Sequence, residues 1–139
     1  MTTEMNKKLV KRFYQAVDQG DTNVVEELFS PEWENIDPAL PPLQGLDGAR
    51  TLIRMLTTSF PNFTSKIDLI AAEDDRVAVR ASHTGTHQGE FLGIPATGKS
   101  VHISATGIFT IKAGKLVQNR VVFDAFGLLQ QLGVIPSHP

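Results

Sequence analysis

The C-terminal stretch from residue 113 to residue 133 carries the side chains best suited to chemistry. It opens with a Gly-Lys turn, continues through β-branched and aromatic residues, and then changes to helical spacing at its leucines. Alternate side chains of a strand share a face, so Arg120, Val122 and Asp124 are expected on one face. Charged groups on a largely apolar face need a partner or a wet pocket. We therefore expect acid/base chemistry here first.

Asp124 is the predicted general base of this site, because it stands where the strand turns into the helix. A dry pocket would raise the carboxyl pKa above its ordinary value of about 3.9 and make the group a better base. The alternative is that Asp124 only caps the helix that begins at Ala125. Arg120 lies four residues away, about 13 Å along an extended strand, so the two would flank a ligand rather than pair. An outward-facing or ion-paired Arg120 is the competing interpretation.

The histidines suggest hydrogen bonding rather than metal binding. His83 and His87 are also four residues apart on a predicted strand, too far to share one ion. We expect no metal site. His87 is the preferred pocket residue and His102 the second choice, although each could equally be an ordinary buried or exposed histidine.

Helical periodicity dominates the first 60 residues. Apolar residues at spacings of three and four predict a helix from about residue 3 to residue 19, and Gly20 ends it. Asp21 is expected to cap a shorter second helix that closes at residues 30–31. The proline-containing segment 33–44 is predicted to be a loop or a short extended segment, and Asp47 is the expected cap of a third helix that Pro61 stops.

The pattern changes to a period of two after Pro61 and keeps it almost to Asp124. Four strands are predicted, at about 63–71, 75–88, 99–111 and 115–124. Helices followed by an antiparallel sheet are typical of an α+β fold with the helices on one side of the sheet.

Composition sets the outer limits. The chain has 139 residues, no cysteine and a formal net charge of −2, with a pI near 6.0. It fits one domain, residues 1–139, that needs no disulfides. Without a signal-like apolar run or a window of ~20 apolar residues, we expect a cytoplasmic protein that does not enter membranes. The absence of a basic stripe argues against a nucleic-acid partner.

Three segments together resemble the SnoaL-like polyketide cyclases. They are TGTHQGEFLGIPATGK at residues 84–99, the Gly114-Lys115 dipeptide, and the pattern DxxGLLQQLG at residues 124–133. The opening helices and the FSPEW segment at 29–33 are also similar to that family. The resemblance implies a cone-shaped α+β barrel, shared with ketosteroid isomerase and nuclear transport factor 2. In it, N-terminal helices pack on a curved, mostly antiparallel sheet that encloses a pocket.

The resemblance also implies an activity and a set of site residues. Cyclases of this family close the last ring of an aromatic polyketide by an intramolecular aldol reaction without a cofactor, using an aspartate that Asp124 resembles in position. The substrate-binding residues expected on this basis are Arg120, Asn35, His87, His102 and Trp33. The sequence departs from the pattern at Gly107, where a related cyclase carries a pocket histidine, and at Arg120, where many relatives have tryptophan.

The predicted function is thus a cyclase or isomerase acting on a hydrophobic, carbonyl-bearing small molecule. Two alternatives stay open: a hydroxylase-like or hydrolase-like relative that uses the same pocket, and a non-catalytic small-molecule-binding module. Both faces of the 99–111 and 115–124 strands are apolar, and helices on one side cannot cover them both. We therefore expect a homodimer.

Overall fold

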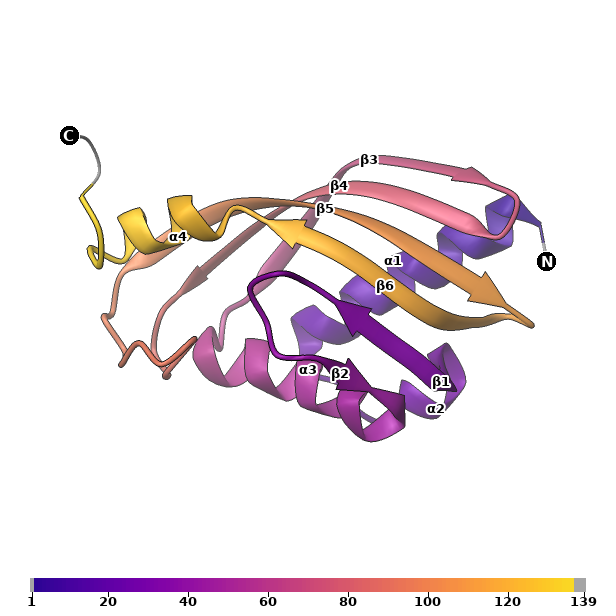
Figure 1. The fold of residues 1–139 in the computed structure, drawn as a ribbon, viewed down its shortest axis with the longest axis horizontal. Helices are drawn as coiled ribbons and strands as arrows, with labels where there is room; N and C mark the ends of the chain where they lie inside the picture. The colour runs from indigo at the N-terminus through magenta and orange to yellow at the C-terminus, as the bar shows by residue number, and fades with distance from the viewer. Residues whose placement is uncertain (1, 137–139) are drawn as a thin grey trace.

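One curved sheet of six strands organises the chain. The computed structural model describes residues 2–136, and its strands follow the order β2-β1-β6-β5-β4-β3 (Figure 1). The strands are β1 (Phe29–Ile36), β2 (Leu43–Gln44), β3 (Thr64–Glu73), β4 (Arg76–Thr86), β5 (Ser100–Lys112) and β6 (Lys115–Phe123). The helices are α1 (Thr3–Gln19), α2 (Val25–Leu28), α3 (Gly45–Ser59) and α4 (Ala125–Gln131). The predicted α+β class is confirmed.

Two tight turns build the long antiparallel part of the sheet. β3 and β4 are joined at Asp74-Asp75, and β5 and β6 at Ala113-Gly114, as the sequence predicts. Asp74 and Ala113 adopt left-handed φ angles of 52° and 51°, and Gly114 one of 77°. Such turns match the right-handed twist of the flanking strands. All four predicted strands begin and end within two residues of the observed ones.

The segment from residue 21 to residue 44 differs from the prediction. α2 is a single turn, and β1 occupies residues that the sequence analysis divided between a helix and a loop. β1 pairs in parallel with β6 and antiparallel with β2, and its register with β6 shifts between Phe29 and Glu34. Pro31 lies within that irregular part, where a missing N–H breaks no regular ladder bond. Long-range pairing to β6 therefore overrides the local helix and turn signals.

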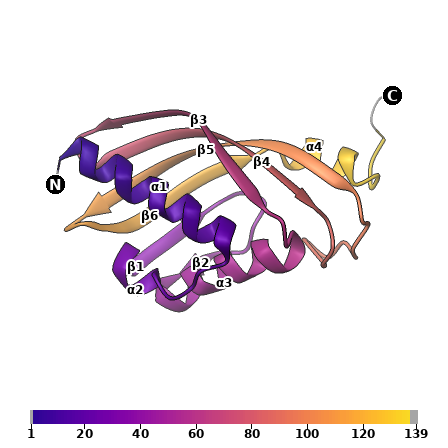
Figure 2. The same cartoon turned by 180° about the vertical axis from the view of Figure 1, so that it is seen from behind.

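α1 and α3 cover the same face of the sheet (Figure 2). Thr2 caps α1, with its Oγ1 accepting from the N–H of Met5 at 3.1 Å, and Gly20 ends the helix with a φ of 64°. α3 begins at Gly45, so the prediction that Asp47 is its cap is wrong. Asp47 lies instead in the first turn of α3, where its negative charge interacts favourably with the helix dipole. Its Oδ1 also accepts a hydrogen bond from Arg50.

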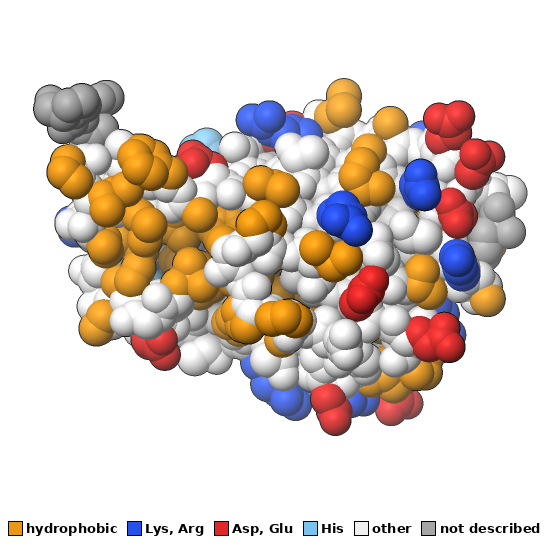
Figure 3. All heavy atoms as spheres, viewed as in Figure 1, with side chains coloured by type: hydrophobic (Ala, Val, Ile, Leu, Met, Phe, Trp, Pro, Cys, Tyr) orange, Lys and Arg blue, Asp and Glu red, His pale blue; other side chains and the backbone are white. Residues whose placement is uncertain are grey.

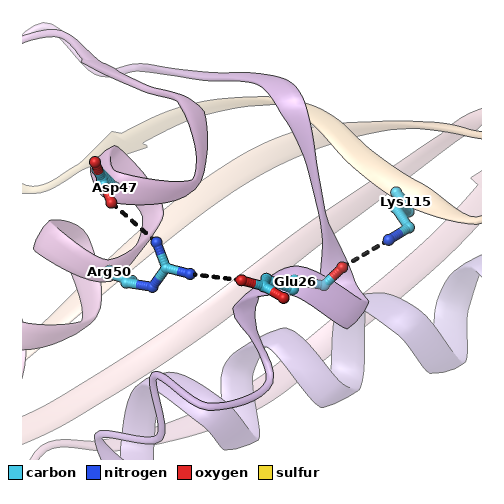
Figure 4. Close-up of polar contacts among 4 residues, drawn as sticks. All are labelled: Glu26, Asp47, Arg50 and Lys115. Carbon is cyan, nitrogen blue, oxygen red and sulfur yellow. Dashed lines mark hydrogen bonds and ion pairs between the residues drawn. The ribbon is translucent and has the colours of Figure 1, made fainter.

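A group of charged side chains joins α2, α3 and the start of β6 (Figure 4). Arg50 on α3 contacts Asp47 at 2.9 Å and Glu26 of α2 at 3.2 Å. Lys115 donates to the backbone carbonyl of Glu26 at 2.6 Å. Exposed ion pairs of this kind contribute little individually. Their effect here is to fix where α2 meets α3 and β6.

The other face of the sheet and α4 leave apolar side chains in solvent. Figure 3 shows hydrophobic atoms gathered on the side that carries α4, with charged groups mostly on the opposite side. The large exposed hydrophobics are Met5, Leu69, Leu92, Ile108, Val122, Phe126 and Val134. In the part of the chain that the structure describes, no helix is long and apolar enough to cross a membrane.

Candidate functional site

A cavity of about 100 Å³ lies between the helix-covered face of the sheet and the helices. Its wall is made mainly of aromatic and aliphatic side chains from α1, α3 and strands β4 to β6. The polar residues that line it are Tyr14, Asn35, Asp37, His83 and Asn119. An apolar pocket with a few converging polar groups is the usual form of a small-molecule site.

Parallel pairing of β1 and β6 brings two of these polar residues together. Asn35 and Asn119 are direct register partners, and both are buried. Neither amide atom of Asn119 has a hydrogen-bond partner, and both are sealed from solvent. An unpaired buried amide is costly, so this pair of amides marks a place where a bound group could supply the missing hydrogen bonds.

Asp37 is the one carboxylate among the residues that line the cavity. It follows β1 directly, two residues beyond Asn35, and its Oδ1 accepts from the N–H of Ala39 at 2.9 Å. Burial raises the pKa of Asp37, and the hydrogen bond from Ala39 opposes that shift. A raised pKa moves a carboxylate closer to the working range of a general base.

His83 of β4 also lines the cavity and stacks with the rings of Tyr14 and Phe63. The ring centroids are 6.1 Å and 5.1 Å away, and the planes are within 27° and 21° of parallel. Burial lowers the pKa of His83, while the charges of Asp18 and Asp68 act in the opposite direction. Burial also raises the pKa of Tyr14, so its phenol stays protonated. The cavity therefore contains a neutral imidazole and a neutral phenol.

Asp124 lies elsewhere, and its surroundings do not favour the predicted catalytic role. Its side chain is exposed and does not line the cavity. Its Oδ1 accepts from the N–H of Gly127 at 2.9 Å, so it caps α4. This is the alternative that the sequence analysis left open.

Arg120 and His102 are also exposed and do not line the cavity. Arg120, Val122 and Asp124 do alternate on one face, but it is the face that the cavity does not use. The backbone N–H and carbonyl of His102 bond the Gln131 side chain at 2.7 Å and 2.9 Å, which holds α4 against β5. The geometry does not support a direct ligand contact for either residue.

Two further predicted residues are buried without lining the cavity. Trp33 packs edge-on against Phe29 at 5.1 Å, inside the core. His87 closes the base of the 87–99 loop, where its Nδ1 accepts from the N–H of Thr97 at 3.2 Å. Of the predicted ligand contacts, only Asn35 lines the cavity.

The β6 residues that line the cavity differ in strand parity from those predicted for the site. Asn119, Val121 and Phe123 line the cavity, whereas the sequence analysis favoured the residues between them. The other face includes Gln118 and Arg120, so the alternation itself indicates that it is the outer face. Asn119 is a polar residue that shares its face with Val121 and Phe123, and this combination is the pattern that could have identified it in the sequence.

Gly107 has a structural reason for lacking a side chain. It lies on the buried face of β5, and a Cβ there would come within 3.0 Å of the ring of Phe109 and 3.2 Å of Val121. The Phe109 ring fills the space that a larger residue at 107 would use. The departure from the related cyclase is thus part of how this cavity is packed.

The family model described as SnoaL-like polyketide cyclase matches residues 8–132. The chain belongs to the SnoaL-like polyketide cyclase family.

Three proteins illustrate the sequence identity and structural similarity of the relatives. Aklanonic acid methyl ester cyclase DnrD of Streptomyces peucetius is 30% identical over 138 residues, covering 96% of this chain and 92% of DnrD. The structure of TsrD from Streptomyces laurentii superposes with a TM-score of 0.87 at 27% identity, covering 97% and 99% of the two chains. AclR of Streptomyces galilaeus, a candidate hydroxylase, gives 0.85 at 28% identity, covering 99% and 87%. The predicted family and cone-shaped fold are confirmed.

In the described part of the chain, metal-binding side chains do not cluster. Among residues 2–136, no group of three or more His, Asp, Glu or Cys side chains is arranged to hold an ion. The chemistry available within the cavity is that of one carboxyl, one imidazole, one phenol and two amides.

Proposed function

We propose that this SnoaL-like protein is a cofactor-independent cyclase that performs aldol-type acid/base chemistry on a hydrophobic, carbonyl-bearing small molecule. The observation that carries the proposal is Asp37, a carboxyl group in an apolar cavity whose burial raises its pKa. The family membership supports cyclisation, and the named activity of DnrD suggests a polyketide-like substrate.

In the proposed reaction, the Asp37 carboxylate removes a proton from a carbon flanked by carbonyl groups. The carbanion attacks a ketone carbon of the same molecule, forming the new C–C bond, and the ketone oxygen becomes an alkoxide. That oxygen then takes the proton back from Asp37. One proton moves from carbon to oxygen and nothing is lost, so the product is an isomer of the substrate.

The amides of Asn35 and Asn119 are the proposed donors to the developing oxyanion. Amide donors in a dry site stabilise the negative charge that develops on the substrate oxygen. The Asn119 amide is sealed in this structure, so it needs a side-chain rotation to reach a bound oxygen. Its register partner Asn35 also lines the cavity.

The test uses aklanonic acid methyl ester, the compound named for DnrD, and follows the mass and retention time of the product. Asp37→Asn keeps the shape of the side chain and should lower turnover by about 10²–10⁴-fold, the usual effect of removing a general base. Asp124→Asn is the matched control, since asparagine caps a helix about as well as aspartate. It should fold and turn over like the parent protein.

The opposite result would return the acid/base role to Asp124. If Asp124→Asn folds but loses turnover while Asp37→Asn keeps it, our assignment is wrong. Binding of the ester without conversion by the parent protein would favour the non-catalytic binding module.

Hydroxylation is the second candidate function, supported by the similarity to AclR. The same assay separates the two, because hydroxylation adds one oxygen atom to the product mass and cyclisation adds none. A product heavier by one oxygen, formed when an oxidant is supplied, would replace the cyclase proposal.

A further inference from the structure

Three side chains from different elements form a hydrogen-bonded group beside the cavity, which we call the triplet: Asp18 of α1, Ser65 of β3 and His83 of β4. Ser65 Oγ donates to Asp18 Oδ1 at 2.7 Å, and the N–H of Ser65 donates to Asp18 Oδ2 at 2.9 Å. Ser65 Oγ also lies 2.9 Å from His83 Nδ1. Ser65 and His83 are register partners in the sheet, so their side chains share the inner face.

The triplet determines which nitrogen of His83 carries the proton. A serine hydroxyl has one hydrogen, and a carboxylate can only accept. Since Ser65 gives its hydrogen to Asp18, its oxygen must accept from His83, and Nδ1 must be the protonated nitrogen. In the neutral ring, Nε2 then carries the free lone pair.

That lone pair is available to a ligand. His83 lines the cavity, and within residues 2–136 its Nε2 has no hydrogen-bond partner and is not sealed by protein atoms. Asp18 and Tyr14 are the titratable groups next to the ring, and Asp68 acts on it only through its charge, because its carboxylate bonds Ser82 on the other face of the sheet. The rings of Tyr14 and Phe63 lie nearly parallel to the imidazole, so they stack on its faces and not on its Nε2 edge.

We propose that the triplet makes Nε2 of His83 the acceptor for a ligand hydroxyl, so that the pocket selects carbonyl compounds that also carry an enol or phenol O–H. This substrate preference rests on the proposed cyclase function, whereas the tautomer assignment does not. Asp18 and Ser65 are positioning residues: they touch no ligand and act through the ring of His83. Without them the imidazole could present an N–H to the cavity instead of a lone pair.

The first experiment reads the tautomer directly by long-range ¹H–¹⁵N NMR of ¹⁵N-histidine-labelled protein near neutral pH. His83 signals are identified by their absence from His83→Phe. We expect a pyrrole-like Nδ1 and a pyridine-like Nε2. His87 is the internal reference, because its Nδ1 accepts from a backbone N–H and it should show the opposite tautomer.

Variants of Ser65 separate positioning from packing. Ser65→Ala should shift His83 away from the Nδ1–H tautomer, and Ser65→Thr, which keeps the hydroxyl, should restore it. The matched control is Ser82→Ala, which removes another serine–aspartate bond, to Asp68 at 2.6 Å, from the same pair of strands. It should leave the tautomer unchanged. An Nε2–H or doubly protonated His83 in the parent protein, or no response to Ser65→Ala, would overturn the proposal.

The second experiment measures the preference for a hydroxyl with a matched pair of probes, 2-naphthol and 2-methoxynaphthalene. The parent protein should bind 2-naphthol about 3–10-fold more tightly, the usual effect of one hydrogen bond. Ser65→Ala should reduce that ratio, and Ser65→Thr should retain it. Equal binding of the two probes by the parent protein would refute the hydroxyl preference.

Both measurements can fail separately from the turnover assay that tests the cyclase proposal. The expected tautomer and probe preference without conversion of any diketone would leave the triplet standing and remove the cyclase function. Loss of turnover in Asp37→Asn together with an Nε2–H tautomer of His83 would support the cyclase function and refute the proposed role of the triplet.

Discussion

Replacing Asn119 by leucine should make the protein more stable and less active. Asn119 is fully buried, and both polar atoms of its amide lack partners. An unpaired buried amide destabilises a fold by about 1–3 kcal/mol. Leucine has a similar branched shape and no polar atoms, its larger volume can extend into the adjoining cavity, and the neighbouring Phe109 and Val121 are apolar. We therefore expect Asn119→Leu to raise the free energy of unfolding by about 1–3 kcal/mol.

For a chain of this size, such a gain corresponds to an increase in Tm of roughly 3–10 °C, measured by calorimetry. Turnover of aklanonic acid methyl ester should fall by about 10²–10³-fold, because one donor to the oxyanion is lost. Opposite changes in stability and activity are typical of a polar group retained for function.

Asn6→Leu is the matched control. Asn6 is another buried asparagine with an unpaired Oδ1, but it lies on α1 outside the cavity, and its Nδ2 donates to the carbonyl of Asp74 at 3.4 Å. It should change turnover little. A lower Tm for Asn119→Leu would show that the amide is satisfied after all, and unchanged turnover would refute its role in the reaction.

Four other predictions can be checked with simple measurements. Gly107→Ala should lower the unfolding free energy by about 1 kcal/mol or more in urea titrations, because its Cβ meets Phe109; an unchanged midpoint would contradict this. Burial lowers the pKa of His83, so the unfolded chain takes up the proton first and stability is lost as pH falls below about 6.5. Tm should accordingly fall less for His83→Phe than for the parent on acidification, and parallel curves would refute the assignment. Light scattering should give a dimer mass at micromolar concentration, which Val122→Glu should reduce, since Val122 is 59% exposed on the outer face; a monomeric parent would exclude it. Elemental analysis of protein purified without added metal should find no stoichiometric zinc or iron, and finding either would overturn our interpretation of the histidines.

Local sequence determined the elements whose signals are local. The spacing of apolar residues identified α1, and the alternation after Pro61 together with the turns at 74–75 and 113–114 identified four strands to within two residues. These features depend on neighbours a few positions apart, which one sequence displays. The motifs at 84–99 and 124–133 were sufficient to recognise the family.

Tertiary structure decided what depends on distant partners. β1 becomes a strand because β6 pairs with it across more than 80 residues, against the local turn signals around Pro31. The face of β6 that points inward is the one that carries Asn119, Val121 and Phe123, which line the cavity together with residues of α1 and α3. Asn119 accordingly lines the cavity, whereas Asp124 is exposed and caps α4.

The candidate site was even less visible in the sequence. Asp37 stands among prolines, where nothing local distinguishes a pocket carboxylate from a loop one. Asp18, Ser65 and His83 are far apart in the chain and meet because α1 crosses the β3–β4 hairpin. Sequence patterns report which face of an element is apolar, whereas chemistry requires that particular atoms meet, and that is fixed only when the elements pack.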